Sequence, residues 1–233
     1  EHISDGNMVR DVSFNLHKGE IIGFAGLVGA GRSETMKAIF GLTKGAKGDI
    51  YLKGKKTKIS SPVEAMKNGI ALVPENRKEE GLYKVQSVRF NMTIEIMDQF
   101  IKGIRVNEKK EIEITQKYID MMSTKTPTQL QKIGNLSGGN QQKVIIGRWL
   151  ATNPDVLIMD EPTRGVDVGA KSEIYVIMNE LVKKGMSIIM ISSELPEIIN
   201  MSDRIYVMSE GRVTGCLSHE EVTQEAVMQL AAK

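Results

Sequence analysis

The sequence predicts an α/β fold built on a mainly parallel central sheet, and two observations support this class. Short, continuous aliphatic runs recur along the chain, as expected of strands that are covered on both faces. Segments with helical character separate these runs, which occupy residues 20–25, 70–73, 156–160, 187–192 and 205–208. With 233 residues, the chain is long enough for one large domain with an attached lobe, and cramped for two independent domains.

The remaining segments predict two additions to this sheet. Residues 12–16 and 49–52 are shorter, more alternating strands, which predict a small antiparallel flank. Between residues 91 and 151 no strong strand is evident, whereas amphipathic patterns over 108–122 and from 137 onward predict helices. We therefore expect one domain over 1–233 with a helical lobe inserted at about 91–151. Because Glu1 stands where an initiator methionine is expected, we expect the chain to be a piece of a longer polypeptide.

Composition narrows the classes of function. The net charge of +2 gives no support for a nucleic-acid partner. The single cysteine, Cys216, cannot form an internal disulfide, which favours a reducing compartment and a buried thiol. No apolar run approaches the roughly 20 residues that cross a bilayer, so we expect any membrane contact to be peripheral.

A glycine-rich phosphate-binding loop follows the first of the parallel strands. Residues 26–33 read Gly-Leu-Val-Gly-Ala-Gly-Arg-Ser, between a predicted strand and a predicted helix. Glycines allow successive amides to point at phosphate oxygens, and the Ser33 hydroxyl is a ligand for Mg²⁺. Arg32 stands where the pattern asks for lysine, so a turn without ligand remains an alternative. The candidate nucleotide-binding residues are Gly26, Leu27, Val28, Gly29, Ala30, Gly31, Arg32, Ser33 and Glu34.

Two adjacent acids end the strand predicted over 156–160. Asp160 and Glu161 are therefore placed at the carboxyl edge of the sheet, where ligands of such sheets bind. In P-loop proteins the first acid completes Mg²⁺ coordination, and a following glutamate orients or deprotonates the attacking water. The alternative is a pair of solvated acids that begin a turn at Pro162.

A third motif lies between these two in the chain. Residues 136–143 closely resemble the signature motif of ATP-binding cassette (ABC) proteins, and the resemblance extends over nearly the whole chain. A Ser-Gly-Gly sequence that opens a helix offers exposed amides to an anion, although it also serves as an ordinary helix cap. The signature candidates are Ser137, Gly138, Gly139, Asn140 and Gln141.

The resemblance implies how these motifs are used. In ABC proteins two nucleotide-binding domains stack head to tail, so that each nucleotide lies between the P-loop of one domain and the signature of the other. Ser137 would then serve a partner's nucleotide, and Asp167 would lie in a loop at the domain interface.

Besides Arg32, two further positions depart from the family pattern in the domain's own site. Glu75 replaces a glutamine that senses Mg²⁺, and we assign it as a Mg²⁺ ligand with Ser33 and Asp160. Ser193 replaces a histidine that contacts the γ-phosphate, and we assign it a catalytic role with Glu161. With Arg32, these departures predict a degenerate hydrolytic site beside an intact signature. The first ten residues also lack an aromatic residue for the adenine, so we expect either that the cut removed it or that the base is held loosely.

Residues 73–82 and 162–171 resemble the second half of the double-domain ATPase subunits that import ribose, galactose, xylose and similar sugars in bacteria. The resemblance implies an ATPase that uses ATP and Mg²⁺ to drive sugar import, with weak activity in the isolated domain. The implied partners are a second nucleotide-binding domain, transmembrane permease subunits and, indirectly, a sugar-binding protein, at the cytoplasmic face of the membrane. Two alternatives stay open: a soluble ABC ATPase in DNA repair or translation, and a non-catalytic nucleotide sensor.

Overall fold

The computed structural model describes residues 1–233, which divide into two compact units. The first unit comprises Glu1–Leu72, Pro154–Glu161 and Asn179–Lys233, and the second comprises Val73–Asn153 and Pro162–Met178. The predicted lobe over 91–151 lies wholly inside the second unit. None of the helices combines the length and apolar character that crossing a bilayer requires.

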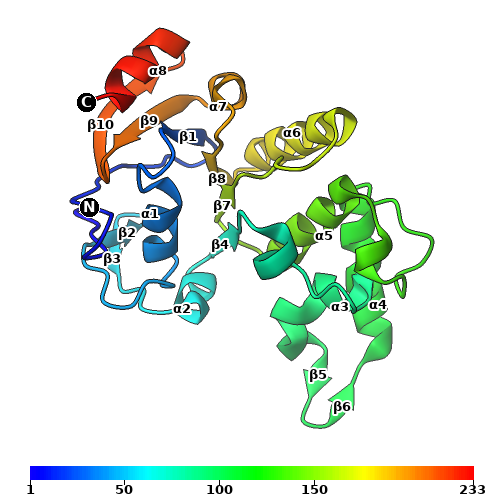
Figure 1. Ribbon diagram of the computed structural model, residues 1–233. Coiled ribbons are helices and arrows are strands. Elements are labelled where there is room, and N and C mark those ends of the chain that lie inside the picture. The colour runs from blue at the N-terminus through cyan, green and yellow to red at the C-terminus, as the bar shows by residue number, and fades with distance from the viewer. The chain divides into compact units, whose positions relative to one another are not determined.

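A six-stranded sheet with the order β10-β9-β1-β8-β7-β4 forms the core of the first unit (Figure 1). Strands β9, β1, β8 and β7 run parallel to one another, and β10 pairs antiparallel with β9 at the edge of the sheet. The sheet comprises β1 (Ile21–Gly26), β4 (Ile70–Val73), β7 (Val156–Asp160), β8 (Ser187–Ile191), β9 (Arg204–Ser209) and β10 (Arg212–Ser218). The five predicted strands and the α/β class are confirmed, whereas β10 was not predicted.

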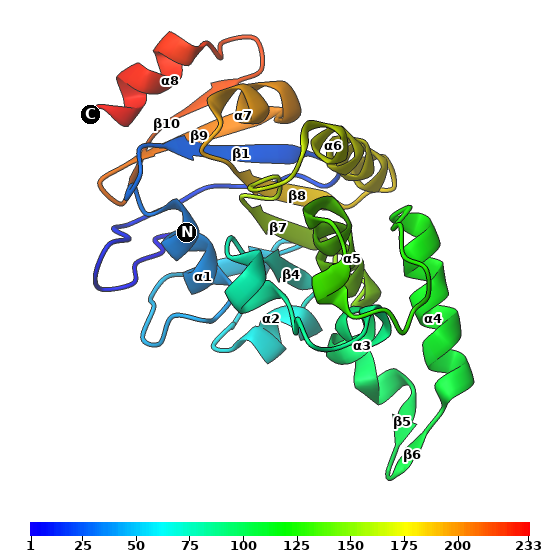
Figure 2. The same ribbon diagram turned by 45° about the vertical axis from the view of Figure 1, so that its right-hand side comes forward.

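Helices cover both faces of this sheet. Figure 2 shows α7 and α8 on one face and α1 on the other. Gly23 of β1 permits the close approach of α7, because a Cβ there would lie 2.8 Å from Ile198 Cγ2. The helices of this unit are α1 (Arg32–Ile39), α2 (Pro62–Lys67), α7 (Leu195–Met201) and α8 (Gln224–Ala231). Continuous burial of β1 and β8 explains their unbroken aliphatic sequences.

The antiparallel flank is smaller than the sequence predicted. Strands β2 (Ile50–Leu52) and β3 (Lys55–Thr57) form a hairpin, which confirms the prediction over 50–52. The strand predicted over 12–16 is wrong, because only Val12 makes a single bridge, to Ile3. The alternating pattern there has another cause: the Phe14 ring packs edge-on against Phe24, and Asn15 bonds to side chains of β9.

The second unit is mainly helical. Its core is α3 (Val88–Thr93), α4 (Glu108–Met121) and α5 (Gly138–Ala151), so the helices predicted over 108–122 and from 137 are confirmed. It also contains a π-helix (Arg77–Gly81), two 3₁₀ helices (Ile94–Gln99 and Ile133–Asn135) and a hairpin of two-residue strands, β5 (Ile101–Lys102) and β6 (Arg105–Val106). Helix α6 (Val168–Lys183) begins in this unit and ends in the first. The buried Arg148 ties α5 to α3 through hydrogen bonds to Asn91 O at 2.6 Å and Oδ1 at 3.1 Å.

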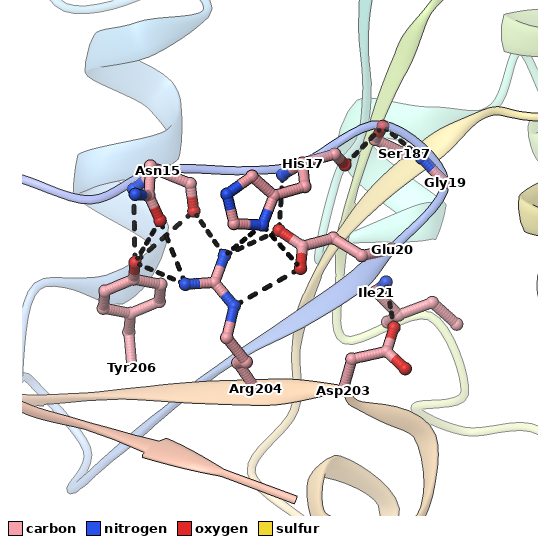
Figure 3. Close-up of polar contacts among 9 residues, drawn as sticks. All are labelled: Asn15, His17, Gly19, Glu20, Ile21, Ser187, Asp203, Arg204 and Tyr206. Carbon is pink, nitrogen blue, oxygen red and sulfur yellow. Dashed lines mark hydrogen bonds and ion pairs between the residues drawn. The ribbon is translucent and has the colours of Figure 1, made fainter.

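A polar cluster fixes the segment that leads into β1, at the amino end of the parallel strands (Figure 3). Arg204 of β9 donates to Glu20 Oε1 at 2.7 Å and to Asn15 Oδ1 at 3.0 Å, and Tyr206 Oη donates to Asn15 Oδ1 at 2.9 Å. Partial burial raises the pKa of Glu20, but hydrogen bonds from Arg204 and the His17 amide outweigh it and hold the pKa below the usual value. The cluster therefore stabilises the fold as an ionised pair.

Cys216 lies on the edge strand β10 and is exposed, which corrects the expectation of a buried thiol. The side chains of an antiparallel edge strand alternate between two faces, and a short run around Gly215 does not reveal which face Cys216 occupies.

Replacing Glu20 with glutamine should destabilise the chain by about 1–3 kcal/mol at pH 7, because it removes a charge-assisted hydrogen bond to Arg204. Since folding lowers the pKa of Glu20, its stabilisation is complete above the usual value of 4.5 and is lost as the pH falls through the folded value. Urea unfolding from pH 7 to pH 3 should thus show the difference shrinking below pH 4.5. The exposed Glu113→Gln is the control; an equal loss at every pH would contradict the assignment.

Candidate functional site

Parallel pairing brings three predicted segments of the first unit to one edge of the sheet. In the register, Ile191 of β8 lies beside both Phe24 of β1 and Asp160 of β7. The chain therefore leaves β1, β7 and β8 at the same carboxyl edge. The segments that directly follow these strands are the phosphate loop after β1, Glu161 after β7 and residues 192–193 after β8.

The phosphate loop has the conformation that its glycines permit. Gly29 and Gly31 have φ angles of 82° and 91°, which glycine adopts without a steric cost. Gly31 precedes α1 as its N-cap residue, so the helix begins at Arg32 and its first amides face the loop. Gly26 cannot carry a side chain, because a Cβ there would lie 2.4 Å from Met208 O of β9. This geometry suits an anion at the helix N-terminus.

The side chain of Arg32 has a protein partner. Its Nη1 donates a hydrogen bond of 2.9 Å to Ser192 O, directly after β8. A lysine at this position would end in a compact ammonium, whereas the longer guanidinium forks and spans from α1 to the neighbouring strand exit. Arg32 therefore joins the phosphate loop to the segment 192–193.

Glu161 is held in a defined orientation at the end of β7. Its φ of 49° lies in the left-handed region, which is uncommon for a residue with a side chain. Its amide donates to Ile191 O at 2.9 Å, and Ser193 Oγ donates to its Oε2 at 3.1 Å. Ser192 Oγ donates to Glu197 Oε2 at 2.8 Å, which fixes the same segment from behind. Glu161 and Ser193, the two predicted catalytic residues, are thus brought into direct contact.

The donor set of the first unit suits a magnesium ion that also takes phosphate oxygens. Ser33 supplies a hydroxyl from the first turn of α1, and the buried Asp160 supplies a carboxylate from the end of β7. Mg²⁺ is commonly held by one or two such groups together with substrate phosphates and water. No cluster of three or more His, Cys, Asp or Glu side chains that could hold a metal occurs. Ser33 and Asp160 therefore fit a Mg²⁺ ion that is bound together with the phosphates of a nucleotide.

The signature residues open α5 in the second unit. The exposed Ser137 is the N-cap, and its Oγ accepts from Asn140 Nδ2 at 2.9 Å. Gln141 Nε2 donates to Leu136 O at 3.0 Å, so this side chain braces the loop before the helix. Gly138 and Gly139 are required by close neighbours: a Cβ on Gly139 would lie 2.3 Å from Ala170 Cβ of α6.

Two further predicted residues of the second unit have partners that the sequence did not indicate. Glu75, predicted as a Mg²⁺ ligand, forms an ion pair with Arg164. Asp167 Oδ1 accepts from the Ala170 amide at 3.0 Å and so begins α6. Arg164 engages one oxygen of the Glu75 carboxylate, and the role of Glu75 as a Mg²⁺ ligand stays a prediction.

The sequence reasoning missed Arg164 and the Ser192 carbonyl as partners of site residues. Arg164 follows Glu75 by 89 positions, and no spacing rule connects them. A backbone carbonyl carries no sequence signal at all. The sequence signal was limited to two unusual residues, Arg32 where the family has lysine and Glu75 where it has glutamine. Each of these charged side chains needs a hydrogen-bond or ion-pair partner.

Comparison with known proteins gives one consistent result. Residues 9–164 match the family model described as ABC transporter. The galactose/methyl galactoside import ATP-binding protein of Fusobacterium nucleatum is 53% identical over 226 residues, which cover 97% of this chain and 45% of that protein. The ribose import ATP-binding protein of Clostridium tetani is 50% identical over 99% of this chain and 46% of that protein. The chain thus spans about half the length of the curated relatives it matches.

Solved structures agree with the sequence matches. An ATP-binding cassette of an ABC transporter superposes with a TM-score of 0.82 at 27% identity, covering 97% of this chain and 93% of that one. A nucleotide-free ATP-binding cassette gives a TM-score of 0.80 at 27% identity, with 95% and 89% covered.

Replacing Gly139 with alanine should destabilise the chain by about 1–3 kcal/mol, because the added methyl overlaps Ala170. The matched change Gly169→Ala should be neutral or stabilising, since its nearest atom is 3.4 Å away and alanine favours a helix. Urea unfolding of both variants measures the difference. A Gly139→Ala variant as stable as the wild type would show that α5 and α6 are not packed as described.

Proposed function

The chain belongs to the ABC transporter ATP-binding family, and from this premise we propose that it is one of two ATP-binding domains in the subunit that powers a sugar importer. The observation that carries the proposal is the contrast between its two sets of motifs. The signature is complete, whereas the phosphate site departs from the family pattern at Arg32, Glu75 and Ser193.

The relatives support the sugar class and the two-domain organisation. Those compared above are import proteins for galactosides and ribose, and each is about twice as long as this chain. The resemblance of residues 73–82 and 162–171 to the second half of such subunits favours placing this chain there. The first half would then carry the lysine-bearing phosphate loop and the histidine.

The domain's own site binds MgATP and hydrolyses it slowly. The glycine conformations and the start of α1 provide the amides for the phosphates, and Ser33 and Asp160 provide the oxygens for Mg²⁺. Phosphoryl transfer depends on positioned positive charge. Arg32 directs one of its N–H groups to Ser192 O, and Ser193 supplies no imidazolium, so binding is retained better than chemistry.

Glu161 is the general base that allows this site to hydrolyse ATP at a low rate. A general base must face the attacking water, and the hydrogen bond from Ser193 both orients its carboxylate and occupies one oxygen. The carboxylate then takes the proton of that water. Turnover at this site therefore depends on Glu161 and is low.

The signature serves the nucleotide of the partner domain. Ser137 is exposed at the start of α5, and its hydroxyl and the first amides of the helix are donors for phosphate oxygens. Gln141 braces this loop and leaves the anion contacts to Ser137 and the glycine amides.

The remaining partners follow from the import role. The surface around Glu75 and the helical lobe docks on a cytoplasmic loop of the permease subunits, which places the domain peripherally at the cytoplasmic face of the membrane. A sugar-binding protein acts indirectly, through the permease.

A non-catalytic nucleotide sensor is the second candidate. The internal contacts of Arg32 and Glu75 favour it, because both charged groups are engaged within the protein. It predicts that Glu161→Gln changes neither turnover nor nucleotide exchange in the isolated chain.

In the full-length subunit, Ser137→Ala should lower steady-state ATP turnover by at least tenfold while leaving MgATP binding by the isolated chain unchanged. The matched control is Ser61→Ala, because Ser61 caps α2 in the same way and its loss costs a similar 0.5–2 kcal/mol, roughly. Equal turnover in the Ser137 and Ser61 variants would sink the proposed division of labour.

A further inference from the structure

We propose that Arg77 is a positioning residue that fixes the signature loop and the loop 164–167 relative to each other, an inference that rests on the proposed role of Ser137. It acts through these loops and does not itself contact nucleotide. All the residues concerned belong to the second unit.

The guanidinium of Arg77 lies between the two loops. Its Nη2 donates to Gly165 O at 3.4 Å, and the same nitrogen lies 3.1 Å from the position of a Cβ on Gly138. That Cβ position is also 3.0 Å from Gly165 O. One arm of Arg77 therefore lies close to both the first glycine of the signature and a carbonyl of the loop 164–167, and a side chain at Gly138 would crowd both.

The segment that carries Arg77 is itself held in place. Arg77 begins a five-residue π-helix, a rare element that occurs frequently at functional sites. Asn76 caps it by accepting from the Glu79 amide at 3.3 Å. At its other end, a Cβ on Gly81 would lie 2.9 Å from Ile145 Cδ1, so the π-helix packs along α5.

A second contact joins the same two segments. Glu75 pairs with Arg164, and Arg77 bonds to the next residue, Gly165. The successive residues Arg164 and Gly165 are thus connected to residues 75 and 77 of the other segment. A displacement at Glu75, on the surface proposed to face the permease, is transmitted to Asp167 and Ser137 through these contacts.

The contacts of Arg77 contribute little to the stability of the fold. Its Nε and Nη1 are buried and have no hydrogen-bond partner, and burial lowers the pKa of the guanidinium. A buried charge with unsatisfied donors costs free energy, and an apolar side chain of similar size is often neutral or stabilising in its place. Stability therefore does not account for an arginine at position 77. Its charge and its place between the two loops do, which distinguishes it from an arginine whose role is to stabilise the fold.

The test is Arg77→Met, which keeps an unbranched apolar side chain and removes the charged guanidinium with its N–H donors. Its melting temperature should equal or exceed that of the wild type. In the full-length subunit the kcat for ATP should fall at least tenfold with KM within twofold. In the isolated chain, hydrogen exchange should rise at least tenfold for amides 138–141 and 165–170, and stay unchanged over 26–33. Arg77→Lys, which retains one donor towards Gly165, should give intermediate values.

The control is Arg89→Met in the same unit, because Arg89 forms ordinary ion pairs with Glu108 and Glu111. It should lower the melting temperature and leave kcat unchanged. Unchanged kcat and exchange in Arg77→Met would overturn the inference, and so would a melting temperature that falls as in the control. If Ser137→Ala lowers turnover while Arg77→Met does not, only the role of Arg77 fails; if neither does, the proposed function fails.

Discussion

The parallel register of β1, β7 and β8 is the constraint on which the phosphate site depends. It aligns Phe24, Asp160 and Ile191 across three adjacent strands, so the phosphate loop, Glu161 and Ser193 leave the sheet at one edge although they are far apart in the chain. Buried strands of this kind tolerate neither a shift of one residue nor a polar substitution, because each has side chains packed on both faces. The core of the first unit therefore brings the segments of the site together, and contacts such as Ser193–Glu161 then orient individual side chains.

Charged residues at two unusual positions have acquired partners inside the protein. Arg32 reaches Ser192 O and Glu75 reaches Arg164, so each group that departs from the family pattern is compensated by a local contact. The Glu75–Arg164 pair is partly exposed and therefore contributes only about 0–1 kcal/mol to stability, so its main effect is to connect the two segments. The Arg32 contact joins α1 to the segment after β8, and the Glu75 contact joins the segment after β4 to Arg164, although these residues are far apart in the sequence.

The elements with continuous or strictly periodic patterns could be predicted from the sequence, because burial on both faces leaves an unbroken aliphatic run. Strands β1, β4, β7, β8 and β9 are of this kind, and α4 has an amphipathic pattern, whereas α5 is buried along most of its length. The segment 12–16 failed because Phe14 is apolar for a different reason, namely its contact with Phe24 and Tyr206. Strand β10 was missed because an edge strand with Gly215 at its centre has only a weak pattern. Motifs located the phosphate loop, Asp160, Glu161 and the signature, whereas the Ser192 carbonyl, Arg164 and Arg77 are defined by tertiary contacts that no spacing encodes.

The central claim is that this domain binds MgATP in a site that is poor at hydrolysis. The most direct test is to measure MgATP affinity and single-turnover hydrolysis by the isolated chain beside the variant that carries Arg32→Lys and Ser193→His together. The account predicts similar affinities, slow hydrolysis by the wild type, and faster hydrolysis by the variant once a partner domain with an intact signature is added. Rapid hydrolysis by the unmodified chain, or failure to bind MgATP, would contradict it.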